Sequence, residues 1–253
     1  MLNALYVRGI GLKSQIPKDN YLSGLPVIKG LAKMEDLAFQ SPVTFFVGEN
    51  GPGKSTLIEA IAVAMGFNAE GGTKNFRFST VRAHSSLHEY LKVVKGFKMM
   101  KDGFFLRAES FFNVATNVDA LDGEPSFSPP IIGSYGGTSL HAMSHGESFL
   151  ALAQNRFGGK GLYILDEPEA ALSPSKLLSL MCIMRRLEKD DSQFIISTHS
   201  PILMAYPGAC IYLLEDEEIK LSQYRETQHY SLTRRFLENP EKMLSHLFCE
   251  DEE

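Results

Sequence analysis

Residues 48–55 form a glycine-rich segment that is suited to binding phosphate. The segment reads Gly-Glu-Asn-Gly-Pro-Gly-Lys-Ser and directly follows the apolar run 43–47. Backbone N–H groups that such a loop presents at the start of a helix can bind several phosphate oxygens at once. Lys54 would reach the β- and γ-phosphates of a nucleotide, and Ser55 would offer its hydroxyl to Mg²⁺. The segment therefore predicts a nucleotide-binding loop.

The expected nucleotide contacts come from this loop and from the first turn of the helix after it. The glycines supply backbone conformations and a close approach to the ligand that larger side chains would obstruct. Thr56 is placed to reach the α-phosphate. The full set of expected contacts is Gly48, Glu49, Asn50, Gly51, Pro52, Gly53, Lys54, Ser55 and Thr56.

Two carboxylates end a second apolar run, residues 163–165, later in the chain. Asp166 lies at the carboxyl end of the predicted strand, where open α/β sheets bind ligands, and we expect it to hold Mg²⁺ opposite Ser55. Glu167 follows directly and therefore points elsewhere, so it can orient or deprotonate the attacking water. Two acids in this position could also form a solvated turn, but the phosphate loop in the same chain favours the magnesium site.

Alternating strands and helices must bring these residues together. From residue 43 onward the chain alternates apolar strands with helical segments, which predicts an α/β fold with a mostly parallel central sheet. We expect strands at 43–47, 161–165, 193–197 and 209–214, and helices at 56–65, 147–157 and 174–188.

The remaining segments predict smaller elements around this sheet. The 76–108 segment indicates short strands, with a hairpin turn at Asp102-Gly103. The other expected elements are a strand at 4–12, a short helix at about 30–37, a strand at 218–223 that pairs with the preceding one, and a terminal helix that begins at Asn239-Pro240.

Size and composition are those of a globular protein with one full α/β core. The chain has 253 residues, of which 44% are hydrophobic and 22% are charged. No apolar stretch approaches the ~18–20 residues that span a bilayer, and the first residues lack the features of a signal peptide. The three cysteines are widely spaced and have no partner at metal-ligand spacing. We therefore expect a cytoplasmic protein without disulfides or direct membrane insertion.

Charge is distributed unevenly along the chain. The net charge is −5, which argues against coating of nucleic acid by the whole surface, and the last four residues are all acidic. Segment 74–107 is locally basic, with only Glu89 and Asp102 as acidic residues. Its basic residues are Lys74, Arg77, Arg82, Lys92, Lys95, Lys98, Lys101 and Arg107. Such a segment is either an ordinary solvated surface or a nucleic-acid contact.

The motifs together resemble those of the ATP-binding-cassette (ABC) ATPase superfamily. More narrowly, the chain resembles the soluble RecF- and SMC-related "AAA" ATPases of DNA maintenance and phage defence. The similarity covers roughly residues 40–215. It rests on the phosphate loop through Thr56, on the segment Leu165-Asp166-Glu167-Pro168-Glu169-Ala170-Ala171-Leu172-Ser173-Pro174, and on Ile196-Ser197-Thr198-His199-Ser200-Pro201. The resemblance implies ATP and Mg²⁺ as ligands and a catalytic group of Lys54, Glu167 and His199.

A fourth motif of the superfamily opens a helix with Ser-Gly-Gly. Its counterpart here is Met143-Ser144-His145-Gly146-Glu147, in which His145 departs from the usual glycine. The resemblance implies that Ser144 and Gly146 contact the γ-phosphate of an ATP that is bound to the other subunit of a homodimer. An ordinary N-capped helix is the alternative interpretation of this segment.

Two expectations concern residues near these motifs. The family's glutamine loop should follow the strand that ends near 108, but the chain has no glutamine there, and Glu109 is the candidate for a metal- or water-facing role. The remaining histidines carry no motif, and we expect them to be surface or packing residues: His84, His88, His141, His229 and His246.

The sequence therefore predicts a single ABC-type P-loop ATPase domain, 1–253. We expect an antiparallel β subdomain from 1–42 and 74–108, and a helical signature lobe from 109–157. The expected activity is ATP hydrolysis coupled to homodimer formation, in DNA maintenance or phage defence, with DNA or RNA and a separate effector protein as candidate partners. Two alternatives stay open: the nucleotide-binding subunit of a membrane transporter, and a regulatory switch controlled by ATP.

Overall fold

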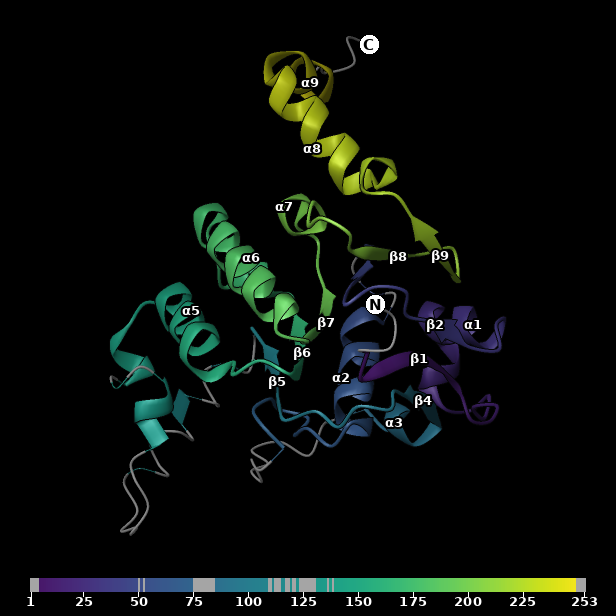
Figure 1. Ribbon diagram of the computed structural model, residues 1–253. Helices are drawn as coiled ribbons and strands as arrows, with labels where there is room; N and C mark the ends of the chain where they lie inside the picture. Colours follow the sequence, from purple (N-terminus) through teal and green to yellow (C-terminus); the bar gives the residue numbers. More distant parts are fainter. Residues whose placement is uncertain are drawn as a thin grey trace.

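A computed structural model of the chain describes residues 5–49, 51, 53–74, 85–108, 111, 115, 116, 119, 122, 131–135, 137 and 139–248. Figure 1 shows a central sheet with helices on both sides, a smaller sheet beside it, and two C-terminal helices that project away from the rest. Glu109, Asn50 and Pro52, three of the expected site residues, lie outside the described ranges.

Six described strands form the central sheet in the order β5-β6-β7-β3-β8-β9. The neighbours from β5 to β8 are parallel, and β9 is antiparallel to β8. The mostly parallel sheet that the sequence predicts is thus confirmed. The strand bounds are β3 (Val43–Val47), β5 (Asp102–Arg107), β6 (Gly161–Asp166), β7 (Gln193–Ser197), β8 (Cys210–Glu215) and β9 (Glu218–Ser222).

Helices cover both faces of this sheet, as the fully buried strands require. All five residues of β3 are buried, and they alternate between two hydrophobic clusters. Phe46 packs in the cluster that contains Leu57 of α2, whereas Phe45 packs in the cluster that contains Phe149 of α5 and Leu180 of α6. The described α-helices are α1 (Pro26–Ala32), α2 (Lys54–Ala64), α3 (Leu87–Tyr90), α5 (His145–Arg156), α6 (Pro174–Lys189), α7 (Pro201–Met204), α8 (Gln228–Glu238) and α9 (Pro240–Phe248).

The second sheet is antiparallel, with strand order β2-β1-β4. Its strands are β1 (Val7–Leu12), β2 (Leu37–Ala38) and β4 (Leu91–Lys95). The expected N-terminal antiparallel region is therefore present. The helix expected at about 30–37 instead occupies 26–32, because Pro26 stands at its first turn and favours a helix start there.

Asp102-Gly103 begins β5 and is not the hairpin turn that the sequence indicates. The Asp102 carboxylate accepts hydrogen bonds from the Gly158 N–H and the Tyr163 hydroxyl, both at 2.8 Å, and lies 3.0 Å from Arg156 Nη1. These contacts anchor the strand start, so β5 joins the central sheet in parallel with β6. The Asp-Gly pair has the composition of a turn, but long-range contacts decide its structure here.

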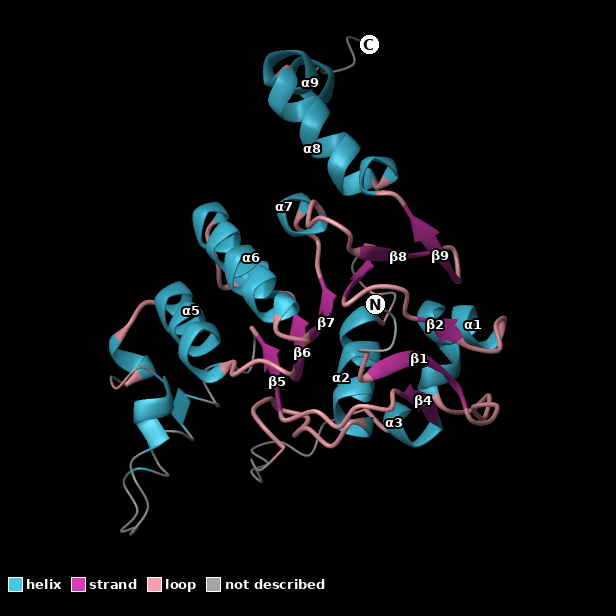
Figure 2. Cartoon of the chain, in the orientation of Figure 1, coloured by secondary structure: helices cyan, strands magenta, loops and turns pink. Residues whose placement is uncertain are grey.

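The two C-terminal helices extend away from the body of the molecule, as Figure 2 also shows. The sequence predicts α9 but not α8. Neither helix contains a buried residue, and both expose large apolar side chains, among them Leu237 and Phe248. No helix in the described ranges combines the length and apolar character that a bilayer-spanning segment needs.

A buried glutamine joins the two sheets. Gln193 at the start of β7 is 1% exposed, and its Oε1 accepts hydrogen bonds from the N–H groups of Tyr6 (2.8 Å) and Val7 (2.9 Å). Its Nε2 donates to the Val7 carbonyl oxygen at 2.8 Å. This one side chain therefore satisfies three backbone groups at the start of β1.

We expect Gln193→Leu to lower the free energy of unfolding by about 2–4 kcal/mol, because it leaves buried backbone N–H groups without partners. Urea denaturation followed by circular dichroism measures the change. Gln154→Leu, at an exposed position of α5, serves as the matched control and should change stability by less than about 0.5 kcal/mol. Equal stability of the Gln193 variant and the wild type would contradict this role.

Candidate active site

The phosphate loop connects β3 to α2 and has the backbone that only glycine adopts easily. Gly51 and Gly53 have φ angles of 98° and 92°, in the left-handed region. A Cβ atom on Gly53 would lie 2.7 Å from Val27 Cγ1, so a side chain has no room there. The loop thus presents backbone N–H groups at the start of α2, as phosphate binding requires.

Lys54 is the first residue of α2, and its ammonium lies inside the loop. The side chain is 4% exposed, and Nζ donates hydrogen bonds to the carbonyl oxygens of Gly48 (2.9 Å) and Glu49 (2.5 Å). Burial lowers the pKa of Lys54, while three nearby carboxylates act in the opposite direction. Phosphate oxygens would compete with the two carbonyls for the same ammonium protons.

Asp166 lies at the carboxyl end of β6, between two residues that the sheet register aligns with it. Arg107 of β5 and Ser197 of β7 are its cross-strand partners. Ser197 Oγ donates to Asp166 Oδ1 at 2.5 Å, and Arg107 Nε lies 3.4 Å from Oδ2. The carboxyl is 6% exposed, and burial raises its pKa even though the Ser197 hydrogen bond and Arg107 oppose the shift.

Arg107 therefore belongs to this site and not to an open basic surface. Its Nη1 also contacts Glu59 Oε2 of α2 at 2.7 Å, so the guanidinium links α2 to the edge of the sheet. Two further members of the basic segment are paired, Lys92 with Asp36 and Lys98 with Asp191. Arg77 and Arg82, two further members of the segment, lie outside the described residues.

Ser55 and Asp166 have the chemistry of Mg²⁺ ligands. The Ser55 hydroxyl is hydrogen-bonded to the Asp166 carboxylate, so two oxygen donors from α2 and β6 meet at one point. Mg²⁺ prefers oxygen ligands and keeps several waters besides substrate phosphates, so two protein ligands suffice. The described residues contain no group of three or more His, Cys, Asp or Glu side chains that could form an all-protein metal cage.

Glu167 occupies a strained backbone position directly after Asp166. Its φ of 48° lies in the left-handed region, which is uncommon for a residue with a Cβ atom and recurs at functional sites. The Glu167 N–H contacts both the carbonyl oxygen (3.2 Å) and Oγ (3.1 Å) of Ser197. Glu167 Oε1 lies 3.4 Å from His199 Nε2. The structure thus brings together two of the expected catalytic residues.

Glu169 is a site residue that the sequence did not single out. It is largely buried, and its Oε1 accepts hydrogen bonds from Thr198 Oγ1 (2.9 Å) and from the backbone N–H of His199. Burial raises the pKa of Glu169, and these hydrogen bonds act against the shift. Glu169 therefore fixes the backbone at the end of β7, although in sequence it lies thirty residues away. The sequence offered one indication of this role, because Glu169 belongs to the same Asp-Glu-Pro-Glu segment as Asp166 and Glu167.

His229, expected to be a surface or packing residue, is half-buried and contacts a residue of the expected catalytic group. Its Nε2 lies 3.2 Å from His199 Nδ1, and the two ring centroids are 5.4 Å apart. His229 is on α8, a helix that the sequence did not predict, so no local pattern could indicate the contact.

The signature segment lies apart from the phosphate loop of its own chain. In Figure 1, α5 lies with α6 on one side of the central sheet, and α2 lies on the other side. Ser144 is the N-cap of α5, and its backbone N–H (3.0 Å) and hydroxyl (2.5 Å) both donate to Glu147 Oε2. Gly146 is buried, and a Cβ atom on it would lie 2.9 Å from the Ala171 carbonyl oxygen. This chain alone therefore does not bring Ser144 and Gly146 to Lys54.

Two protein-family models match the chain. One, described as "AAA domain, putative AbiEii toxin, Type IV TA system", matches residues 132–205, and the other, described as "AAA domain", matches residues 28–110. The first range contains Ser144, Asp166 and His199, and the second contains the phosphate loop. A search of curated protein sequences found no match.

Solved structures show the same fold. The chain is similar to cbiO1 from Clostridium perfringens, part of the ABC transporter complex cbiONQ, with 15% sequence identity, 96% of this chain and 98% of that chain covered, and a TM-score of 0.53. An SMC head bound to the C-winged helix domain of ScpA has 14% identity, 86% and 97% coverage, and a TM-score of 0.48. At these identities the likeness concerns the fold alone.

The sheet order, the phosphate loop and the family matches define an AAA/ABC-type P-loop domain. The chain thus has matches to AAA-domain family models and a fold similar to that of cbiO1, in line with the P-loop ATPase fold that the sequence predicts.

The buried Glu169 carboxylate predicts a pH-dependent stability. Its folded-state pKa is raised, so its contribution to stability is present below the unfolded-state pKa and is lost as pH rises through the folded-state pKa. Glu169→Gln keeps an acceptor oxygen without the charge. Without nucleotide, we expect this variant to be more stable than the wild type by about 1 kcal/mol at pH 7.5, with the difference shrinking toward pH 4.

Urea denaturation at several pH values measures this difference. Glu147→Gln is the control, and its change in stability should have the opposite sign. Hydrogen bonds from Ser144 lower the pKa of the exposed Glu147. The Glu147 variant should therefore be less stable than the wild type at pH 7.5 and equally stable at low pH. A Glu169→Gln difference that does not vary with pH would contradict the assignment.

Proposed function

We propose that this chain binds ATP with Mg²⁺ and hydrolyses it to ADP and phosphate. The observation that carries the proposal is the convergence of four side chains at the carboxyl edge of the central sheet. Lys54 follows β3, Asp166 and Glu167 follow the apolar part of β6, and His199 follows β7. Parallel strands place these ends at one edge, where α/β sheets bind ligands.

Each residue has a role that its surroundings support. Lys54 and the N–H groups of the loop would neutralise and orient the β- and γ-phosphates. Ser55 and Asp166 would hold Mg²⁺, which when bound neutralises charge on the phosphate oxygens. Glu167 would orient the attacking water and accept its proton, while the bond between the γ-phosphorus and the β–γ bridging oxygen breaks. His199, next to Glu167, would contact the γ-phosphate.

A second copy of the chain would complete the site. Ser144 and Gly146 stand at the start of α5, where backbone N–H groups and a hydroxyl suit a phosphate, yet α5 is remote from α2 in Figure 1. We infer that this face covers the phosphate loop of a partner subunit, so that ATP links the two copies in a homodimer. Hydrolysis would remove the linking phosphate and release the subunits.

For the biological setting, we favour a defence or nucleic-acid-linked role. The match to a family model described as a type IV TA system component supports it over a transporter subunit, for which the likeness to cbiO1 supports the fold alone. The candidate partners are DNA or RNA and a separate effector protein.

Glu167→Gln tests both parts of the proposal. Loss of the carboxylate should slow phosphate release by about 100-fold or more, while Lys54 and Ser55 still bind the nucleotide. We therefore expect the variant with ATP and Mg²⁺ to form a long-lived dimer in light scattering, and the wild type to form a transient one.

Glu241→Gln, on the exposed helix α9, is the matched control and should hydrolyse ATP as the wild type does. A Glu167 variant that stays monomeric at saturating ATP would contradict the dimer, and wild-type phosphate release by the same variant would contradict the role of Glu167.

A further inference from the structure

The first turn of α8 lies against the catalytic edge of the sheet. Thr227, the N-cap of α8, is 0% exposed, and its Oγ1 accepts a hydrogen bond from the Tyr230 N–H at 3.3 Å. His229 follows two residues later and contacts His199. A helix that otherwise projects into solvent is therefore fixed to the body next to the proposed γ-phosphate site.

The His199 imidazole has a polar neighbour at each ring nitrogen, and of these two contacts the one at Nδ1 is a hydrogen bond. Nδ1 lies 3.2 Å from His229 Nε2, and Nε2 lies 3.4 Å from Glu167 Oε1. The two partners come from different elements, α8 and the turn after β6. Glu169 also holds the backbone N–H of His199, but a backbone contact does not determine how the ring rotates or which nitrogen carries its proton.

We propose that His229 is a positioning residue, which holds the His199 ring in the orientation and tautomer that present Nε2–H to Glu167 and the γ-phosphate. The proposal rests on the function proposed above. Nε2 faces the Glu167 carboxylate at 3.4 Å, and a negative charge on that side favours a proton on Nε2, which leaves Nδ1 of a neutral ring as an acceptor. His229 must then donate from Nε2. The hydrogen bond at Nδ1 of His199 thus determines that the proton of this ring is on Nε2.

The surroundings of His229 favour the single donor that this arrangement needs. Burial lowers the pKa of His229, and a protonated His199 and the charge of Lys54 would lower it further, against the opposite effect of Glu49. His229 is therefore neutral at neutral pH, with one N–H. Its Nε2 is the nitrogen that faces His199, whereas its Nδ1 is buried without a hydrogen-bond partner among the described residues.

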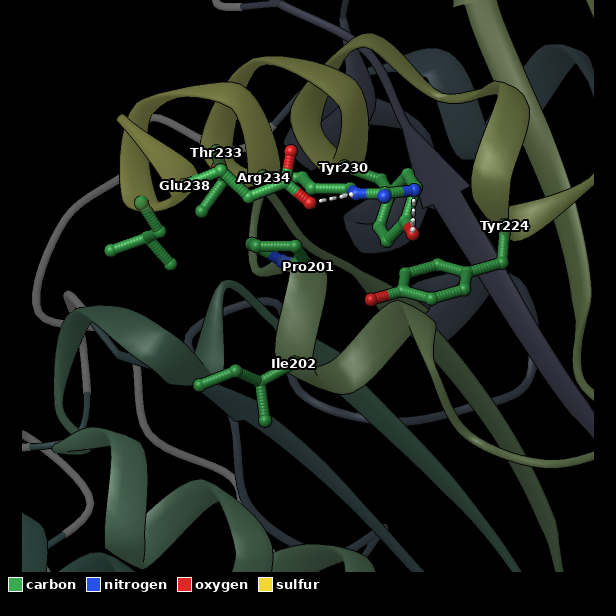
Figure 3. A pocket seen from close by; sticks show the side chains of 8 residues that line it. Pro201, Ile202, Tyr224, Tyr230, Thr233, Arg234 and Glu238 are labelled. Carbon is green, nitrogen blue, oxygen red and sulfur yellow. Dashed lines mark hydrogen bonds and ion pairs between the residues drawn. The ribbon is translucent and has the colours of Figure 1, made fainter. Parts of the chain in front are cut away.

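An open pocket lies near the histidine pair, between α7 and α8. Figure 3 shows Pro201 and Ile202 of α7 in this pocket, together with Tyr224 and Tyr230. Its volume is about 380 Å³. Since α7 begins two residues after His199, the His199–His229 hydrogen bond is a polar contact between α8 and the turn that precedes α7.

Three variants of His229 test the proposal. His229→Leu removes the donor, His229→Asn keeps polarity but is too short to reach Nδ1, and His229→Gln can place an amide N–H near the original Nε2. We expect kcat for ATP to fall by about 10- to 100-fold in the first two, with KM nearly unchanged, and to recover in the glutamine variant. His246→Gln, at an exposed position of α9, is the control and should retain wild-type turnover.

Long-range ¹H–¹⁵N spectra of the histidine rings provide a readout that does not depend on hydrolysis. The wild type should show His199 as the Nε2–H tautomer, and the leucine and asparagine variants should show a mixture with the Nδ1–H form. An unchanged His199 signal and unchanged kcat in both variants would overturn the proposal. If the wild type does not hydrolyse ATP, the proposed function fails, yet the tautomer spectra still decide whether His229 positions His199.

Discussion

The concentration of negative charge at the carboxyl edge of the central sheet is the constraint around which this structure is built. Asp166, Glu167 and Glu169 lie within four consecutive residues, and burial raises the pKa of the first and third. Buried carboxylates are costly unless cations or hydrogen-bond donors compensate them. Lys54 and Arg107 supply positive charge, while hydroxyls and N–H groups of β7 and its following turn supply the donors.

This compensation explains why several elements must meet at one place. Arg107 reaches Asp166 because β5 and β6 are paired in parallel, and it reaches α2 through Glu59. Ser197 reaches Asp166 because β6 and β7 are paired in the same register. Mg²⁺ and a triphosphate would introduce charges of both signs into this group, so their binding and hydrolysis would change the balance on which the local structure depends. A site of this kind is suited to a switch between two states.

The sequence predicted the part of this structure that local patterns encode. Strands β3, β6 and β7 are continuous apolar segments, which predict buried strands. The glycine-rich sequence of the phosphate loop is specific enough to predict that loop by itself. The sequence did not predict α8 or the contact of His229 with His199, since α8 buries no residue of its own and this contact spans thirty residues. Asp102-Gly103 was misread because its long-range contacts outweigh its local turn preference. Arg107 was counted with exposed basic residues because spacing does not reveal cross-strand partners.

The central claim is that two copies of the chain share each catalytic site, and mixing two inactive variants tests it most directly. Lys54→Ala disables the phosphate loop, and Ser144→Arg disables the signature face. Each alone should show almost no ATP hydrolysis. In an equimolar mixture, half of the dimers would contain one intact site, so we predict recovery of about a quarter of wild-type turnover. No recovery on mixing, with both variants folded and the wild type active, would contradict a site shared between subunits.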